Sequence, residues 1–225
     1  MKPSNIVLLS MVAVLLSGMY STNLVLKKEF IKIDLGDPQK NYVSVDSGAF
    51  QVLEISGSNG YPIVIEKGTR NDVKVLRRRI SFFKKERAGD TLRIHFSGSN
   101  MPLDQSMSNQ NPVGIIIQCP SVEHVLIKDT YTRLKGFENE QLTLQLEGNA
   151  FSDFQNCRFS KLSITAKSRS IFAFTQQNSV DTLALRLTNT SNGFLYKVDY
   201  GVLQPTLGDS ALVTLSGSSL MEIMK

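Results

Sequence analysis

Two patterns of apolar residues divide the chain. Pro3 to Leu26 is a run of 24 residues without a charge, rich in valine, leucine and methionine. At a rise of about 1.5 Å per residue, a helix of this length can cross a bilayer. From Lys28 onward, short runs of alternating apolar residues are separated by Gly, Asn, Ser and Asp, which is typical of strands and turns. The sequence therefore predicts a transmembrane helix followed by an all-β domain.

The apolar run predicts where the protein is located in the cell. The stretch Ser17–Ser21 fits a signal-peptidase site poorly, and the run is longer than most signal cores, which favours an uncleaved anchor over a cleaved signal. The basic residues at its two ends, Lys2 and Lys27-Lys28, nearly balance, but a short N-terminal flank usually stays in the cytoplasm. We expect an inner-membrane anchor with the remainder in the periplasm. The alternative is a cleaved, periplasmic or secreted protein.

A repeat of about twenty residues organises the second half of the chain. Three alternating apolar residues followed by an aromatic residue occur as Leu142, Leu144, Leu146 and Phe154, and again as Leu162, Ile164, Ala166 and Phe174. The first three positions recur once more as Leu183, Leu185 and Leu187. An earlier copy fits Val125, Ile127 and Leu134, and a last copy fits Leu212, Val213 and Leu215 after an insertion around 204–207. One β-patterned run in each period predicts a solenoid.

The residues between the apolar runs indicate which solenoid forms. A leucine-rich repeat needs an Asn or Cys after its leucines and a helical back face, and neither is seen. Polar pairs such as Gly148-Asn149, Ser168-Arg169 and Asn189-Thr190 follow the runs instead, as corners require. We therefore predict a short single-stranded parallel β-helix with rungs of about 20 residues. The expected domains are an anchor at 1–28, a juxtamembrane linker at 29–47 and the β-helix at 48–225.

The first half of the β region predicts hairpins. Strand patterns begin near Val52, Ile63 and Val73, and Ala88-Gly89-Asp90 turns the chain into another. The glycine-rich stretch ISGSNG at 55–60 resembles a phosphate-binding loop. Such a loop must lead into a helix, whereas here the β-branched residues 61–65 follow. We therefore interpret ISGSNG as a turn.

Two cysteines, Cys119 and Cys157, are present. They lie about two repeats apart, so in stacked coils they are separated by roughly 10 Å. A disulfide needs Cα atoms within about 7 Å. We predict two buried free thiols.

Three stretches carry a family resemblance. FQVLEISGSNGYPIVIEKGTRNDVKV, AGDTLRIHFSG and ALVTLSGSSLMEI, in this order and spacing, resemble the head GIN domain family of putative auto-transporter adhesins, a Bacteroidota-type envelope domain of unknown function. The resemblance covers about residues 48–221. The Ser-Gly-Ala-Ser type corner of the family is kept at Leu215–Ser219, whereas Glu147–Ala150 and Ala166–Arg169 depart from it. The resemblance implies a β-helix in the envelope and transfers no catalytic residue.

Residues able to supply chemistry are scattered. His95 and His124 lack the close ligand spacing of a metal site, so we expect structural or solvent-facing roles. In the predicted register the acids do not stack, because Asp129 falls opposite Gly148, Ser168 and Asn189, and Asp153 falls near Ala173. Asp104, Asp199 and Asp209 lie in segments predicted to be irregular and could converge as a carboxylate pair. The Ser-Gly-Ser triplets at Ser56, Ser97 and Ser216 lack the nucleophile-elbow pattern and are interpreted as turns. We therefore predict no catalytic residue, no cofactor and no metal.

The segment KVLRRRISFFKKER, residues 74–87, concentrates charge. It carries +6, against +5 for the whole chain. Such a segment can contact anionic headgroups or acidic glycans, and the candidate residues are Arg77, Arg78, Arg79, Lys84, Lys85 and Arg87. The alternative is a solvated strand pair with Ile80 and Phe82 in the core, where edge charges prevent aggregation. Export argues against nucleic acid as a partner.

These expectations combine into a functional hypothesis. The chain is a non-enzymatic, membrane-anchored envelope protein with an adhesin-like or structural binding module of unknown ligand. The membrane is contacted through residues 3–26, and the further partner is an anionic lipid headgroup, a glycan or an envelope protein. Two alternatives stay open: a glycan-active enzyme on the same β-helix, and the ectodomain of a membrane sensory or regulatory complex.

Overall fold

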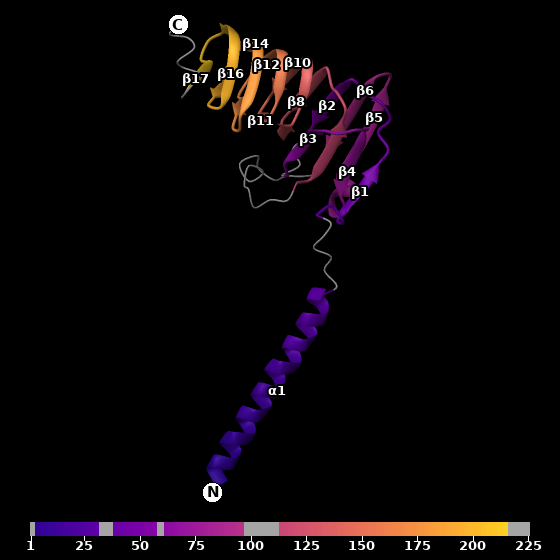
Figure 1. Cartoon of the computed structure of the whole chain (residues 1–225), viewed down its shortest axis with the longest axis vertical. Coiled ribbons are helices and arrows are strands. Elements are labelled where there is room, and N and C mark those ends of the chain that lie inside the picture. Colours follow the sequence, from indigo (N-terminus) through magenta and orange to yellow (C-terminus); the bar gives the residue numbers. More distant parts are fainter. Residues whose placement is uncertain (1–2, 32–37, 58–60, 97–112, 216–225) are drawn as a thin grey trace. The chain divides into compact units, whose positions relative to one another are not determined.

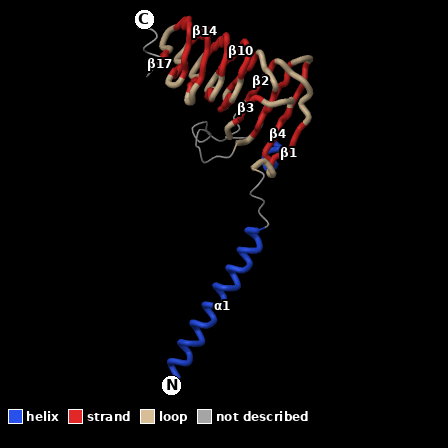
Figure 2. Tube along the Cα trace, in the orientation of Figure 1, coloured by secondary structure: helices blue, strands red, loops and turns tan. Residues whose placement is uncertain are grey.

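The computed structural model describes residues 3–31, 38–57, 61–96 and 113–215 of the chain (Figures 1 and 2). These residues form two compact units, Met1–Asn41 and Tyr42–Lys225. The second unit begins with β1 (Tyr42–Val45), inside the stretch 29–47 that the sequence predicts as a linker. Each unit is described by itself.

The first unit is dominated by helix α1 (Pro3–Ile31), which is long and apolar enough to cross a membrane. None of its residues is buried. Several of its hydroxyl groups bond back to the helix: Ser17 Oγ donates to Ala13 O at 2.8 Å, and Ser21 Oγ donates to Ser17 O at 2.8 Å. An apolar surface on all sides with satisfied hydroxyls suits a hydrocarbon environment, although a signal sequence shares these features.

The second unit is a β-solenoid of about five turns built from two sheets. Sheet A has the spatial order β1, β4 (Asp72–Leu76), β7 (Ile115–Cys119), β3 (Ile63–Lys67), β9 (Tyr131–Lys135), β11 (Phe151–Gln155), β13 (Ile171–Phe174), β15 (Asn192–Leu195) and β17 (Leu212–Leu215). Sheet B has the order β16 (Val198–Leu207), β14 (Asn178–Leu187), β12 (Arg158–Ala166), β10 (Glu138–Glu147), β8 (His124–Lys128), β2 (Val52–Ser56), β6 (Thr91–Phe96) and β5 (Phe83–Ala88).

From β8 onward the solenoid is regular, with one strand of each turn in sheet B and the next in sheet A. All neighbours in this part pair in parallel. Leu142 pairs with Leu162, which pairs with Leu183, so the repeated leucines stack in register. The predicted parallel β-helix with rungs of about twenty residues is confirmed.

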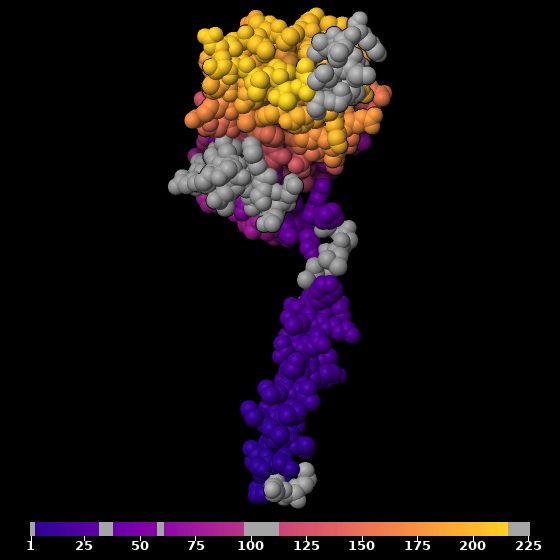
Figure 3. Space-filling view, turned by 90° about the vertical axis from the view of Figure 1, so that its left-hand side faces the viewer, coloured from indigo at the N-terminus to yellow at the C-terminus, as the bar shows by residue number. Residues whose placement is uncertain are grey.

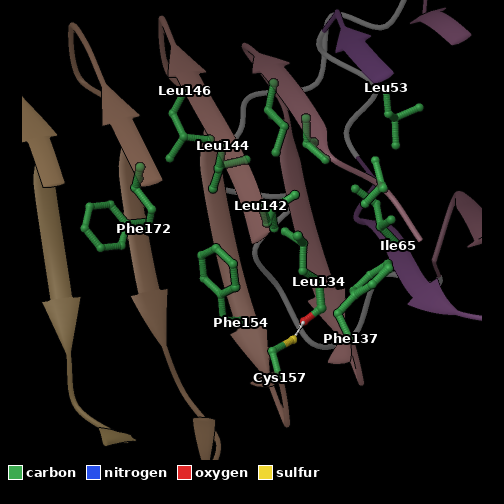
Figure 4. Close-up of a cluster of buried hydrophobic side chains, with 14 of the residues drawn as sticks. Leu53, Ile65, Leu134, Phe137, Leu142, Leu144, Leu146, Phe154, Cys157 and Phe172 are labelled. Atoms are coloured by element: carbon green, nitrogen blue, oxygen red, sulfur yellow. Dashed lines mark hydrogen bonds between the residues drawn. The ribbon is translucent and has the colours of Figure 1, made fainter. Parts of the chain in front are cut away.

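The interior of the regular part is filled by stacked apolar side chains (Figure 4). Leu144 and Leu146 have no exposed surface. Phe154 stacks on Phe174 with ring centroids 4.7 Å apart and meets Phe159 edge to face at 6.4 Å. Because each turn buries its side chains only against its neighbours, the rows act as one continuous core. Figure 3 shows the C-terminal turns as one packed body.

The corners of the regular turns are polar, as predicted. Asp129, Ser168 and Asn189 adopt positive φ angles of 52°, 63° and 54°, and Gly148 adopts 69° at the equivalent position. Asp129 Oδ1 accepts a hydrogen bond of 2.9 Å from the backbone N–H of Asn149. Asp129 therefore holds a corner and belongs to no acidic stack.

The predicted insertion around 204–207 is wrong. These residues belong to β16, where Leu203, Pro205 and Leu207 pair with the repeat leucines of β14. Leu212–Leu215 instead form β17 in sheet A and pair with β15. Proline interrupts the sequence pattern, but it is tolerated in β16 because this is the last strand of sheet B in the described residues, where one N–H needs no partner.

Most of the predicted hairpins are also wrong. β2 and β3 lie in different sheets, so ISGSNG leads the chain from one sheet to the other. Gly57 has a φ of 98°, and a side chain there would overlap the carbonyl of Phe96, so its role is conformational. Residues 58–60 lie outside the described residues, and the next described element is a strand, β3, as predicted, and not the helix that a phosphate loop requires. Among the described strands, β5 and β6 alone pair as a hairpin, around Gly89.

The first strands are out of sequence order in space. β2 lies between β6 and β8, and β3 lies between β7 and β9, all in parallel. The sheets then end in antiparallel strands: β5 follows β6, and β4 and β1 follow β7. The N-terminal end of the solenoid is therefore closed by strands that leave the repeat.

Both cysteines are buried and free, as predicted. The Cys157 Sγ lies 3.6 Å from the carbonyl oxygen of Leu134 (Figure 4). Burial raises the pKa of the Cys119 thiol to about 12, and it also raises the pKa of Cys157. Both side chains behave as small core residues.

Candidate functional site

The basic segment forms the corner between the two sheets at the N-terminal end. Strand β4 ends at Leu76 in sheet A, the 3-10 helix η1 (Arg77–Phe82) follows, and β5 begins at Phe83 in sheet B. Phe82 and Phe83 pack against the core from its edge, whereas Ile80 is 40% exposed. The expectation that Ile80 and Phe82 both lie in the core is correct only for Phe82. A corner replaces the predicted strand pair because the flanking strands belong to different sheets.

Lys85 and Arg87 lie on the inward side of the edge strand β5. The register pairs are Lys85 with Ile94 and Arg87 with Leu92. Ile94 and Leu92 are buried core residues, so the two basic residues continue the inward rows of sheet B at its edge. Inward-pointing charges on an edge strand oppose pairing with another chain. β5 is an edge strand, as the edge-charge alternative supposes, but these two residues lie on its inward side and not on the outer face.

The cationic groups of Lys85 and Arg87 are held by backbone oxygens. The Lys85 ammonium donates to the carbonyl of Asp46, and Arg87 Nε donates to Gly89 O at 3.1 Å. The two cationic groups therefore already have hydrogen-bond partners within the solenoid. Both residues are nonetheless exposed to solvent.

Lys84 lies on the opposite, outer face of β5. It pairs with His95, which pairs with Ser56, and Ser56 Oγ lies 3.0 Å from His95 Nδ1. These residues line a hollow of about 400 Å³ together with an ion pair of 2.7 Å between Arg93 and Glu54. Two acids, Glu54 and Glu86, also line this hollow, so it contains both positive and negative side chains.

Arg77, Arg78 and Arg79 remain as one group on η1. The guanidinium carbon of Arg79 lies 4.0 Å from the centroid of the Tyr61 ring, and that of Arg78 lies 5.4 Å from the same centroid. A second ring, Phe82, lies 5.8 Å from the guanidinium carbon of Arg79. These cation–π contacts orient the flat guanidinium groups. We name Arg77, Arg78, Arg79, Ile80 and Tyr61 the arginine surface.

The arginine surface keeps its positive charge with respect to the described carboxylates. In the described part of the chain, Arg77, Arg78 and Arg79 form no ion pair with a carboxylate. The phenol of Tyr42 lies near Arg78 and donates a hydrogen bond of 2.6 Å to Val113 O. Burial raises the pKa of Tyr42, and the charge of Arg78 acts in the opposite direction. The three guanidinium groups are therefore suited to bind an external anion.

The structure separates the six predicted contact residues into three groups: the arginines of η1, Lys84 on the outer face, and Lys85 with Arg87 on the inner face. Two tyrosines near the arginines were not predicted: Tyr61, whose ring lies under Arg78 and Arg79, and Tyr42, which lies near Arg78. Tyr61 precedes β3 and Tyr42 opens β1, so their approach to η1 depends on the strand order of sheet A. No local spacing in the sequence could have indicated it.

The two histidines lie where solvent-facing roles were predicted. His95 and His124 are exposed, on β6 and β8, with β2 between them. Within the described residues, no group of three or more His, Cys, Asp or Glu is arranged to hold a metal ion. Ser56 ends strand β2, and Ser97 and Ser216 lie outside the described residues.

The acid that is buried within the regular turns, Asp153, is paired. Asp153 is buried and pairs with Arg133 across the strands, with Arg133 Nε 3.2 Å from Asp153 Oδ2, and Gln155 Nε2 donates to the same oxygen at 2.7 Å. Asp153 aligns with Ala173, as predicted.

Asp104, Asp199 and Asp209 were predicted to lie in irregular segments, where two of them could form a carboxylate pair. Asp199 lies in strand β16, which corrects its placement in an irregular segment, and Asp209 lies in an exposed turn. Asp104 lies outside the described residues. Asp199 borders a hollow of about 300 Å³, which also contains Glu138 and Arg158. Glu138, Arg158 and Asp199 lie on β10, β12 and β16, so Glu138 and Asp199 are three strands apart, roughly 14 Å by strand spacing. This separation is too large for a carboxylate pair acting on one bond.

The fold and the surface define a β-solenoid with an arginine-rich N-terminal end. No family model matches the chain, and no curated protein sequence matches it. Among solved structures, a "putative adhesin" from Bacteroides fragilis is similar at 13% identity and a TM-score of 0.48, and the match covers 80% of this chain and 96% of that chain.

Two further solved structures are similar. A "putative adhesin" from Parabacteroides merdae has 10% identity and a TM-score of 0.36, with coverage of 81% and 98%. A "putative lipid binding protein" from Parabacteroides distasonis has 11% identity and a TM-score of 0.40, with coverage of 79% and 94%. Similarity at this level carries no argument about function, which must come from the chain's own residues.

Proposed function

We propose that this chain is a non-enzymatic envelope protein, anchored in the inner membrane by α1, whose solenoid is a binding module. The observation that carries the proposal is the surface of α1. Its residues 3–26 carry no charge, none of its residues is buried, and the hydroxyls of Ser10, Ser17 and Ser21 bond to the helix itself. Such a helix is stable in hydrocarbon, where every polar group must be satisfied internally.

The solenoid supplies a rigid platform for binding. Its stacked core fixes the exposed side chains at the strand spacing of about 4.8 Å. The arginine surface, with guanidinium groups oriented by Tyr61, is the part best suited to an anionic partner. The adhesin-like character of the module is the expectation that the head GIN resemblance brings to the proposal.

The anchor is tested by membrane extraction of the full chain. We expect it to stay in the membrane pellet in alkaline carbonate, with an intact mass that includes residues 3–26. In spheroplasts, added protease should digest the solenoid, as a periplasmic location requires. Release into the supernatant with loss of the N-terminal segment would contradict the anchor.

A pair of variants makes the test specific. Leu15→Arg with Leu16→Arg should release the protein from the pellet, because an arginine at a helix centre costs about 2.5–3.5 kcal/mol of insertion free energy. Leu15→Ala with Leu16→Ala is the matched control and should remain in the pellet. Equal extraction of both pairs would show that α1 does not hold the protein by insertion.

A further inference from the structure

The geometry of the arginine surface matches a phosphate group. Tyr61 lies beneath the guanidinium groups of Arg79 and Arg78 at 4.0 and 5.4 Å. A guanidinium that stacks on a ring keeps its edge N–H groups free, and these bind phosphate oxygens in pairs. Stacking also restricts the long side chain before it binds. The surface therefore offers oriented donors to an anion.

An exposed apolar side chain accompanies these cations. Ile80 follows the three arginines directly and is 40% exposed. The other large apolar residues exposed on the described solenoid, Tyr196, Val202, Leu207 and Leu212, belong to its last turns at the opposite end. An apolar residue among basic residues is a pattern of surfaces that enter the headgroup region of a bilayer. A hydrophilic glycan would leave Ile80 without a favourable contact.

The connection between α1 and the solenoid is short in sequence. Only residues 32–41 separate the end of α1 at Ile31 from β1 at Tyr42. A short tether gives an attached surface a high effective concentration toward its target, so weak contacts suffice. This step rests on the proposed function, because it requires α1 to be inserted.

We propose that the arginine surface docks on the anionic headgroups of the bilayer that holds α1, with Arg77, Arg78 and Arg79 on the lipid phosphates and Ile80 in the headgroup region. Docking holds the N-terminal end of the solenoid at the bilayer. Lys85 and Arg87 take no part, since their side chains bond to backbone carbonyls.

The test uses the full chain in lipid nanodiscs with a nitroxide label at position 81. Ser81 is exposed in η1, and Ser81→Cys leaves Ile80 in place. Cys119 and Cys157 are 0% and 2% exposed, so the added thiol reacts alone under native conditions. Collision of the label with oxygen and with a water-soluble nickel complex reports its depth. Ser160→Cys, on an exposed position of β12, is the matched control.

We expect the label at position 81 to become accessible to oxygen and protected from nickel in discs that contain phosphatidylglycerol. It should stay aqueous in phosphatidylcholine alone, and the label at position 160 should stay aqueous in both. Arg77→Gln, Arg78→Gln and Arg79→Gln together should reduce the ratio of docked to undocked protein about 100-fold, roughly fivefold for each charge. High salt should also lower the ratio of docked to undocked protein for the parent chain, because it screens the arginine charges. This measurement does not depend on the folding of the triple variant.

Three outcomes would overturn the proposal. The label could stay aqueous in phosphatidylglycerol, the triple variant could dock as well as the parent, or protection could arise only when an acidic polysaccharide is added to discs without anionic lipid. The last result would assign the surface to a glycan. Failure of the protein to enter the discs at all would instead refute the anchor, so the two proposals fail separately.

Discussion

The two ends of the solenoid differ in how the rows of buried apolar side chains end. Both must terminate rows of apolar side chains that run through every turn. At the N-terminal end, Lys85 and Arg87 occupy the inward rows on β5, and antiparallel strands replace the parallel repeat. At the C-terminal end of the described residues, β16 and β17 keep the repeat, and Leu207 and Leu212 are about half exposed.

This difference shows where the chain can carry function without weakening its core. In the regular part, each side chain in a row contacts the turn before and the turn after, so a substitution affects two interfaces. The corner η1 lies outside the rows, and its arginines make side-chain contacts with aromatic rings at the edge. The irregular end can therefore present charge at little cost in stability.

The largest expected effect comes from the aromatic stack of the regular part. Phe154→Ala removes a side chain with no exposed surface that contacts Phe174 and Phe159. We expect a loss of about 3–5 kcal/mol in the free energy of unfolding, measured by urea denaturation. Phe83→Ala is the matched change at the N-terminal end, where Phe83 meets Phe96 edge to face at 5.9 Å and is partly exposed. Its loss should be nearer about 1 kcal/mol, and equal losses would remove the contrast between the ends.

A smaller effect is expected from the buried amide that joins turns. Asn178 accepts a hydrogen bond from Cys157 N at 3.0 Å and donates to Phe154 O at 3.3 Å and Lys197 O at 3.2 Å. Asn178→Ala leaves buried backbone groups without partners and should cost about 1–3 kcal/mol. Asn149→Ala, at an exposed corner, is the control and should change stability by less than about 0.5 kcal/mol. Thermal and urea unfolding of both variants would measure the difference.

A pH dependence is expected from Cys119 in β7. Burial raises the pKa of this thiol from 9.0 to about 12, so the folded state keeps a proton that the unfolded chain releases. Its contribution is complete below pH 9 and is lost as the pH rises toward 12, by up to about 1.4 kcal/mol per pH unit. Urea midpoints at pH 8 and pH 10.5 measure the slope. Cys119→Val should flatten it in part, and an unchanged slope would show that other groups cause it.

The sequence indicated the regular part because its rows coincide with the repeat. Alternation within each run and a period of twenty place Leu142, Leu162 and Leu183 in one row without any knowledge of strand order. The error at the last turn arose where Pro205 interrupts alternation in a strand that still pairs along its length. A parallel solenoid is predictable to the extent that each turn repeats the one before it.

The N-terminal end was predicted poorly because non-local pairing determines it. The runs around Val52, Ile63 and Val73 have the pattern of strands, and all three are strands, but alternation does not say which strands pair. The geometry of the candidate surface likewise depends on strand pairing that the sequence pattern does not give. Its charge is visible as RRR in the sequence, whereas the inward position of Arg87 depends on the register between β5 and β6.

The smallest expected effect tests whether Tyr61 orients the arginines. The coupling of Arg79 to Tyr61, obtained from Arg79→Gln, Tyr61→Leu and the double variant, should be about 0.5–1 kcal/mol. Arg186→Gln, on the exposed face of β14, is the control and should show no coupling to Tyr61→Leu, because Arg186 belongs to a regular turn remote from that ring. Urea denaturation at low salt measures all of these variants. If the coupling of Arg79 is also zero, the guanidinium groups are not held by the ring, and the N-terminal end would differ from the regular turns in charge but not in the order of its side chains.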